Sequence, residues 1–487
     1  MENKNQKIEQ EKLFTLSEFR HELGIPLLLA RKLVLWGEIE ALRAVDGTVR
    51  IAHSEVEVAK KLIATPRKKA LYFFRALGPG LITGASDDDP SGIGTYSSVG
   101  AKFGFSILWM AAWLLPVMLA VQEACARIGI VTNHGLVGVL QRHYKKKIVF
   151  AIVILLLVAN IVNIGADLGA MAGALTMLTG FNFFLGAIFF ALLSIVLEIF
   201  IGYHFYVKFL KWLALSVVAY ILAGLFIHPD WLSVFRQTIF PEIQFSEEYI
   251  FAMVAVFGTT ITPYLFFWQA SEEVEENKLH KKLHKLIRGK KGSDLHVRIG
   301  RMRTDVGTGM ILANVVFFFI VLTAAQVFFA NGITDIESAE QAAQALRPLV
   351  GDWAYLLFAI GIIGTGLLAV PILAGSGAYA LAEMMKWNEG LDLKFSRAKG
   401  FYIVIALSIL VGLFLNFLNI NPIKALYYAA FLNGLIAFPL LIVIMVVGND
   451  KRIMGRETHP AWVKFFGWLA VVFMASLILV SIGLYFK

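Results

Sequence analysis

The chain has 487 residues, of which 58% are hydrophobic and only 16% are charged. A soluble domain of this composition would not stay in solution, so we expect a polytopic membrane protein. The formal net charge of +9 does not indicate nucleic-acid binding, because the basic residues are concentrated in alternate loops between apolar segments. The sequence has no phosphate-binding glycine loop, so it does not indicate an ATP-driven pump. It also has no recognisable set of catalytic residues, so we expect neither an enzyme nor a cofactor.

Residues 1–66 are polar and precede the first apolar segment, so we expect them to form a separate cytoplasmic module. Thr15-Leu-Ser-Glu18 is a capping box, which predicts a helix that ends at Gly24. The further signals are a helix over about 27–36, a hairpin at Asp46-Gly47 and a third helix that Ser54 caps and that ends near Leu62.

The order helix, helix, hairpin, helix resembles a small winged helix-turn-helix domain. Such a module binds DNA or a partner, or serves as a docking or regulatory unit. Residues 1–64 contain ten Lys and Arg and ten Asp and Glu, so they lack the basic surface that DNA binding needs. We therefore expect an unknown partner other than DNA.

Eleven apolar segments follow, and each is long enough to cross a hydrocarbon core about 30 Å thick. They are residues 73–102, 105–130, 148–175, 181–203, 207–228, 248–270, 304–330, 353–385, 400–418, 423–447 and 461–486. We expect the protein to lie in the cell (inner) membrane. The positive-inside rule places the N-terminus in the cytoplasm and, because the number of spans is odd, the C-terminus on the outer side. The basic loops that carry this assignment are 142–147, 278–303, 386–399 and 451–456.

Two of these segments contain a helix breaker at mid-membrane. The first holds Asp87-Asp-Asp-Pro-Ser-Gly92, and the sixth holds Gly258-Thr-Thr-Ile-Thr-Pro-Tyr264. Proline removes a backbone donor and breaks a helix, and an ionised carboxylate at this depth needs a partner or water. Paired breaks separated by four unbroken spans predict two five-span inverted repeats, whereas the alternative is two unrelated proline kinks.

The first break predicts a cation site. Asp89 can bind a cation together with carbonyls that the unwound helix releases, from Ser86 and Thr259, and with the hydroxyl of Thr262. Oxygen ligands favour Mg²⁺, Ca²⁺ or Mn²⁺ over softer transition metals. The alternative for Asp89 is a helix cap. Asp88, like Asp87, either touches the ion, lines its approach or pairs with a basic residue.

Four motifs resemble the Nramp family of divalent-metal transporters over about residues 73–447. They are Leu-Gly-Pro-Gly-Leu (77–81) followed by Asp89-Pro90, Gln122-Glu-Ala-Cys-Ala-Arg-Ile-Gly-Ile-Val-Thr132, Ala166-Asp167-Leu168, and Thr262-Pro263-Tyr264. The resemblance implies an all-α LeuT-type 5+5 fold with broken first and sixth helices and transport of a divalent cation. Residues 73–447 would then form the ten-helix core, and residues 461–487 an additional eleventh helix.

The chain departs from typical members at five positions of the site. Gly92 stands where typical members have an Asn ligand, and Thr262 stands where they have a Met ligand. Tyr264 and Gln269 each replace a His, and Ala170 replaces an acidic residue. This set resembles the Nramp-related magnesium transporters. Loss of an amide and a thioether ligand enlarges the site, which suits Mg²⁺ that keeps part of its water shell.

We therefore expect import of Mg²⁺, with Mn²⁺ also carried, without proton coupling. The alternatives are a proton-coupled Mn²⁺/Fe²⁺ symporter and a membrane-tethered metal sensor. The ten histidines lie in the first module, in loops or at span edges, so no imidazole relay crosses the membrane. Asp167 is the candidate proton acceptor, and the alternative is a hydrogen-bonded packing residue.

Other polar residues in the spans have more than one possible role. Asn433 completes the site or bonds between helices, and Tyr264 shapes the cavity, bonds a metal-bound water or packs. Glu123 and Arg127, four residues apart, form a structural or gating pair. Four glutamates, Glu272, Glu273, Glu275 and Glu276, precede His280 and His284, and this segment is either a solvated charged loop or an intracellular metal sensor.

Overall fold

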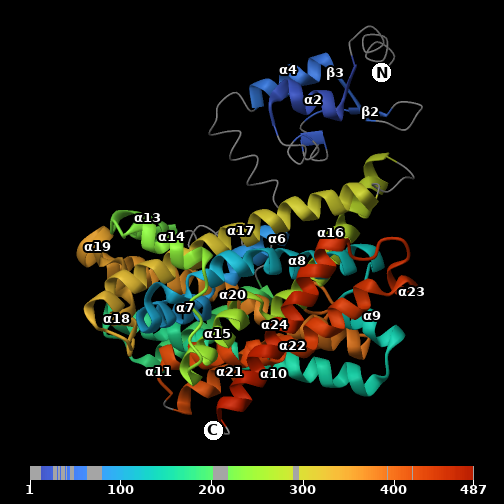
Figure 1. Ribbon diagram of the computed structural model, residues 1–487. Helices are drawn as coiled ribbons and strands as arrows, with labels where there is room; N and C mark the ends of the chain where they lie inside the picture. The colour runs from blue at the N-terminus through green and yellow to red at the C-terminus, as the bar shows by residue number, and fades with distance from the viewer. Residues whose placement is uncertain are drawn as a thin grey trace. The chain divides into compact units, whose positions relative to one another are not determined.

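The computed structural model describes residues 13–25, 30, 33–34, 39, 41–43, 49–62, 79–200, 218–288, 295–391, 393–418 and 420–485. The chain divides into two compact units, Met1–Gly78 and Pro79–Lys487. Each unit is described by itself below, and Figure 1 shows the elements of both.

The first unit is a small sheet with helices. Its elements are β1 (Leu13–Thr15), α2 (Leu16–Leu23), β2 (Ala41–Arg43), β3 (Val49–Ala52) and α4 (His53–Leu62). The strand order is β1-β3-β2 with antiparallel pairing throughout. The predicted capping box is present, because the backbone N–H of Glu18 donates to Thr15 Oγ1 at 3.2 Å and that of Thr15 donates to Glu18 Oε2 at 2.7 Å. Gly24 ends the helix with φ 56°.

Parts of the predicted module differ from the structure or lie outside it. Strand β1 was not predicted, because three residues are too short to show alternation. Helix α4 begins at His53, so Ser54 lies in its first turn and does not precede it. The turn at Asp46-Gly47 and most of the predicted helix over 27–36 lie outside the described residues.

The second unit is a helical bundle. Its helices of eight or more residues in the described ranges are α6 (Pro79–Asp87), α7 (Pro90–Phe103), α8 (Trp109–Thr132), α9 (Leu136–His143), α10 (Lys146–Thr179), α11 (Phe183–Phe200), α13 (Val218–Phe226), α14 (Trp231–Ile239), α15 (Glu247–Thr260), α16 (Pro263–Arg288), α17 (Leu295–Val327), α20 (Ala354–Met385), α21 (Lys399–Leu415), α22 (Pro422–Asn449) and α24 (Ala461–Tyr485). Shorter helices are α18 (Ala339–Ala343), α19 (Arg347–Val350) and α23 (Lys451–Met454).

Nine segments of the described ranges are long and apolar enough to cross a membrane. Two of the eleven predicted spans are not among them. The span over 73–102 begins outside the described residues and is divided into the two short helices α6 and α7. Residues 207–217 of the span over 207–228 also lie outside the described residues, and α13 covers the rest.

Both predicted interruptions are present. Helix α6 ends at Asp87 and α7 begins at Pro90, and helix α15 ends at Thr260 and α16 begins at Pro263. In each case a proline occupies the first position of the second helix, where its missing N–H costs no hydrogen bond. The backbone groups at these helix ends lack intrahelical partners, so side chains, water or an ion must satisfy them.

The interrupted helices pack closely against unbroken ones. Helix α17 contacts both α6 and α7, α22 contacts α7 and α15, and α10 contacts α7, α16 and α22. Figure 1 shows α17 running along the bundle beside α6. Small residues allow these approaches, because a Cβ at Gly84 would lie 2.3 Å from the Gly309 carbonyl and one at Gly258 would lie 2.2 Å from the Gly434 nitrogen.

We predict that Gly84→Ala destabilises the bundle by about 1–3 kcal/mol, because the methyl group forces α6 away from α17. Thermal unfolding of the purified protein followed by circular dichroism measures the effect. Gly307→Ala is the matched control, since a Cβ there meets nothing within 4 Å. Equal melting temperatures for the two variants would show that the α6–α17 contact is looser than described.

Candidate cation site

Asp89 lies at the first interruption and caps the N-terminus of α7. Its Oδ1 atom accepts the backbone N–H of Gly92 at 2.7 Å. Its Oδ2 atom accepts the amide of Asn163 at 3.2 Å and the hydroxyl of Tyr264 at 3.3 Å. The side chain is only 1% exposed. The helix-capping role that we considered as an alternative is thus present, but a carboxylate offers about four lone pairs and capping uses only one of them.

Tyr264 connects the two interruptions. Its hydroxyl donates to the carbonyl oxygen of Ser86 at 2.7 Å and lies 3.3 Å from Asp89 Oδ2. The Ser86 carbonyl is in the last turn of α6, where carbonyls lack an intrahelical partner. The carbonyl that we predicted as a ligand therefore accepts this hydroxyl with one of its two lone pairs, and the other lone pair can still bind a cation.

Gly92 and Thr259 face one another across the two broken helices. A Cβ at Gly92 would lie 3.6 Å from Thr259 Oγ1 and 3.1 Å from the Asp87 carbonyl oxygen. Thr262 lies in the second interruption, and its hydroxyl makes no hydrogen bond to any described residue. All three residues are buried. The site is thus lined by oxygens from both interruptions, and the backbone at Gly92 is packed so closely that a Cβ would also lie 3.3 Å from a ring carbon of Tyr96.

Asn163 joins this site although it was not predicted. It lies on the unbroken helix α10, is fully buried, and donates to Asp89. Its amide oxygen accepts the side-chain N–H of Asn433 at 3.2 Å. Asn433 therefore reaches the site through Asn163, which is the interhelical bond that we considered for it. The only sequence signal for Asn163 is its place one helical turn before Asp167.

Several carboxylate oxygens near the site have no hydrogen bond of ordinary geometry within the described part of the chain. They include both oxygens of Asp87, one of Asp88 and both of Asp167. Asp167 is fully buried and repels Asp89, while a backbone N–H of Ser91 offsets part of this repulsion. Uncompensated negative charge at this depth is expensive, so these side chains favour a nearby cation or proton.

Buried side-chain contacts join α6 to α16 and α7 to α15 near the site. Thr83 on α6 donates to Gln269 Oε1 on α16 at 2.6 Å, and Gln269 Nε2 donates to Glu273 at 3.0 Å. Beyond the other end of the interruptions, the hydroxyls of Tyr96 on α7 and Thr260 on α15 lie 3.4 Å apart. All five side chains are buried. Gln269 thus belongs to the hydrogen-bonded contact between α6 and α16, and it makes no hydrogen bond to Asp89.

Glu123 and Arg127 form the ion pair expected from their spacing, away from the interruptions. Arg127 donates to Glu123 Oε1 at 2.8 Å, and Arg303 of α17 also binds Glu123 at 2.9 Å. A weaker pair joins Arg127 to Glu457 at 3.8 Å. The cluster ties α8 to α17 and to the loop before α24, which is the arrangement of a structural or gating pair.

The prediction of a solvated loop after the sixth span is wrong for its first residues. Helix α16 continues through them, and Glu272 and Glu273 are each only 6% exposed. Glu275 is also engaged, because it accepts the Tyr379 hydroxyl at 2.5 Å. The side chains of His280 and His284 lie outside the described part. Burial of these glutamates is a tertiary effect that the local charge pattern does not show.

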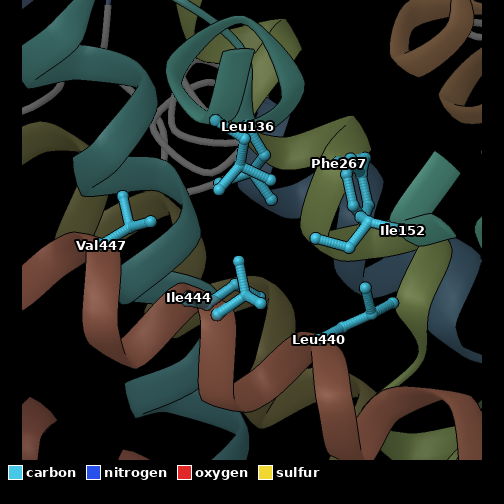
Figure 2. A pocket seen from close by; sticks show the side chains of 8 residues that line it. Leu136, Ile152, Phe267, Leu440, Ile444 and Val447 are labelled. Atoms are coloured by element: carbon cyan, nitrogen blue, oxygen red, sulfur yellow. The ribbon is translucent and has the colours of Figure 1, made fainter. Parts of the chain in front are cut away.

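An apolar pocket lies elsewhere in the bundle. It is lined by Leu136, Leu140, Ile152, Phe267, Leu440, Val443, Ile444 and Val447. Figure 2 shows the labelled side chains of α9, α10, α16 and α22 converging there without a polar group. This pocket offers a cation no ligand. In the described residues, moreover, no three His, Cys, Asp or Glu side chains are grouped so as to hold a metal. A cation site built from the described residues therefore has at most two such side chains and needs carbonyl, hydroxyl or amide oxygens as well.

Comparison with known proteins gives relatives over most of the chain. Divalent metal cation transporters named MntH from two Klebsiella pneumoniae strains are each 24% identical over 430 residues, which is 87% of this chain and 96% of the relative. These relatives are named as transporters and not as enzymes. A crystal structure of the Eremococcus coleocola manganese transporter, bound to an aromatic bis-isothiourea compound, matches with a TM-score of 0.66 at 18% identity. The match covers 84% of this chain and 87% of that one.

The fold of the bundle is therefore that of a solved membrane transporter. Residues 80–483 also match the family described as Natural resistance-associated macrophage protein-like, or Nramp. This match includes both interruptions, Asp89 and the helices that surround them. The chain belongs to the Nramp family.

Proposed function

We propose that this protein carries divalent cations into the cell, that Mg²⁺ is its main substrate and that Mn²⁺ is also carried. The observation that supports this most is Asp89, a buried carboxylate at the meeting point of two helix interruptions. The relatives named as divalent metal cation transporters agree with the class of substrate. A hydrated or partly hydrated ion would bind Asp89 with oxygens of Ser86, Thr259 and Thr262.

The choice of Mg²⁺ rests on the chemistry of the neighbouring groups. The side chains bonded to Asp89 present a hydroxyl and an amide, and no thioether or imidazole bonds to it among the described residues. Thr262 stands where typical family members have a sulfur ligand, and Gly92 where they have an amide. Hard oxygen ligands suit Mg²⁺, a small ion that keeps several waters.

A proton-coupled Mn²⁺/Fe²⁺ symporter is the second candidate. Asp167 favours it, because this buried carboxylate lies near Asp89 without a hydrogen-bond partner of ordinary geometry in the described residues. Gln269 and Ala170 oppose it, since they replace groups that could exchange protons. We propose uncoupled entry driven by the membrane potential, which supplies about 4.6 kcal/mol per 100 mV for a doubly charged ion.

We also propose the finer architecture that the sequence indicates. Residues 73–447 form a LeuT-type core of two inverted five-helix repeats, and residues 461–487 add an eleventh span. The N-terminus is cytoplasmic and the C-terminus lies outside the cell membrane. Residues 1–66 form a winged helix-like module that docks an unknown partner other than DNA. The third candidate function, a membrane-tethered metal sensor, would act through this module without cation flux.

Asp89→Ala is expected to weaken Mg²⁺ and Mn²⁺ binding by more than about 100-fold, because it removes the one ionised ligand. Isothermal titration calorimetry of the full-length protein in detergent provides the measurement. Asp335→Ala, which removes a carboxylate from an exposed loop, is the matched control. Unaltered binding by the Asp89 variant would place the cation site elsewhere.

We expect millimolar Mg²⁺ to inhibit Mn²⁺ uptake into proteoliposomes, because both ions would compete for one oxygen-lined site. Uptake can be followed with a fluorescent Mn²⁺ indicator trapped inside the vesicles. Choline chloride added at the same ionic strength controls for screening of surface charge. Mn²⁺ uptake that is indifferent to Mg²⁺ would favour the ordinary Mn²⁺/Fe²⁺ symporter, and absence of any flux would favour the sensor.

Mg²⁺ uptake is expected to proceed without acidification of the vesicle lumen and to rise when the lumen is made electrically negative. A trapped pH indicator and a potassium–valinomycin potential provide the two readouts. Vesicles that contain the Asp89→Ala protein measure the passive proton leak. Acidification that requires both Mg²⁺ and the unaltered protein would contradict uncoupled transport.

A further inference from the structure

Asn163 is the residue of α10 that contacts the candidate cation site. It is 0% exposed, and its amide uses both of its ends. The nitrogen donates to Asp89 Oδ2 at 3.2 Å, and the oxygen accepts from Asn433 Nδ2 at 3.2 Å. Two carboxamides from α10 and α22 thus form a chain that ends on the carboxylate. Nothing in the local sequence of α10 requires an amide here, since the helix is unbroken through this position.

The direction of the hydrogen bonds from Asn433 through Asn163 to Asp89 suits a site without a cation. A carboxylate only accepts hydrogen bonds, so the N–H end of Asn163 stabilises it. A doubly charged ion beside Asp89 reverses the requirement, because the N–H dipole would then point its positive end at the ion. The amide oxygen, which now faces Asn433, is the end that a cation attracts.

The side-chain amides of Asn163 and Asn433 can both rotate by half a turn and still form a hydrogen bond with each other. Oxygen and nitrogen of a carboxamide are nearly equal in size, so half a turn of both amides leaves the packing unchanged. After the turn, Asn163 Nδ2 would donate to Asn433 Oδ1, and Asn163 Oδ1 would face the site. The cost of presenting an oxygen to the cation is therefore small.

The distance between the two groups matches direct coordination. Two oxygen ligands at adjacent corners of an Mg²⁺ octahedron, each about 2.1 Å from the ion, lie about 3.0 Å apart. The atoms of Asn163 and Asp89 that face one another are 3.2 Å apart. A turned amide would thus place its oxygen beside the carboxylate oxygen with the separation that one ion needs.

We infer that Asn163 is a cation ligand of this transporter, whose amide oxygen turns toward the ion beside Asp89 while Asn433 holds the amide nitrogen. This inference rests on the proposed function. It supplies from α10 the amide oxygen that typical family members provide from the position of Gly92. Asn163 would then be a donor when the site is empty and a ligand when the site is filled.

The test is calorimetric titration of the full-length protein with Mg²⁺ alone and with Mn²⁺ alone. Asn163→Ala is expected to weaken Mg²⁺ binding about 10-fold or more. Asn163→Asp is expected to restore binding, since it presents an oxygen without a turn. Asn160→Ala is the matched control, because Asn160 is one turn earlier on α10 and bonds Leu373 and Ser376 of α20. This control is expected to bind Mg²⁺ as the unaltered protein does.

Melting temperatures give a second readout, which tests whether an ion beside Asp89 reaches position 163. Asn163→Asp places two carboxylates about 3.2 Å apart, so it is expected to lower the melting temperature in EDTA and to enlarge the increase that Mg²⁺ produces. If Asn163→Ala fails to fold, the melting temperatures of Asn163→Asp in EDTA and in Mg²⁺ provide the test by themselves. A folded Asn163→Asp protein without enhanced stabilisation by Mg²⁺ would overturn the inference.

The outcomes separate this inference from the proposed function. Normal Mg²⁺ binding by Asn163→Ala, together with lost binding by Asp89→Ala, would remove Asn163 from the site and leave the site itself. Equal loss in Asn160→Ala and Asn163→Ala would assign both asparagines to packing. Normal binding by both the Asp89 and Asn163 variants would instead contradict the proposed function.

Discussion

The structure depends on how a carboxylate is kept in the centre of an apolar bundle. Asp89 is buried, yet it accepts a backbone N–H from Gly92 and two side-chain donors from Asn163 and Tyr264. The backbone donor exists only because the helix stops and restarts at Pro90. A continuous helix would offer no free N–H there and no free carbonyl at Ser86. The interruption therefore supplies the hydrogen bonds that stabilise a buried carboxylate at this depth.

Glycines on the interrupted helices allow close contacts with the unbroken helices beside them. Short half-helices have few turns with which to bury apolar surface, so they are held by close backbone contacts. Gly84 on α6 and Gly258 on α15 each allow such an approach, to α17 and α22 respectively. Single side-chain bonds, Thr83 to Gln269 and Tyr96 to Thr260, also join α6 to α16 and α7 to α15.

The sequence predicts the parts of this arrangement that have a local cause. Proline and aspartate in an apolar run locate the first interruption, and Pro263 locates the second. The capping box at Thr15 is equally local and is present. Residues whose role depends on tertiary contacts were missed. Asn163 lies on an unbroken helix, and only the packing of α10 against α7 brings it to Asp89. Glu272 and Glu273 carry the pattern of a solvated loop, yet the continuation of α16 buries them.

The central claim is that one divalent ion binds between the two interruptions with Asp89 as its charged ligand. Anomalous X-ray diffraction from crystals grown with Mn²⁺ tests it most directly, because the ion's signal gives its position independently of the protein density. The account predicts a single strong peak within coordination distance of the Asp89 carboxylate. A peak at the buried glutamates of α16, with none beside Asp89, would contradict it.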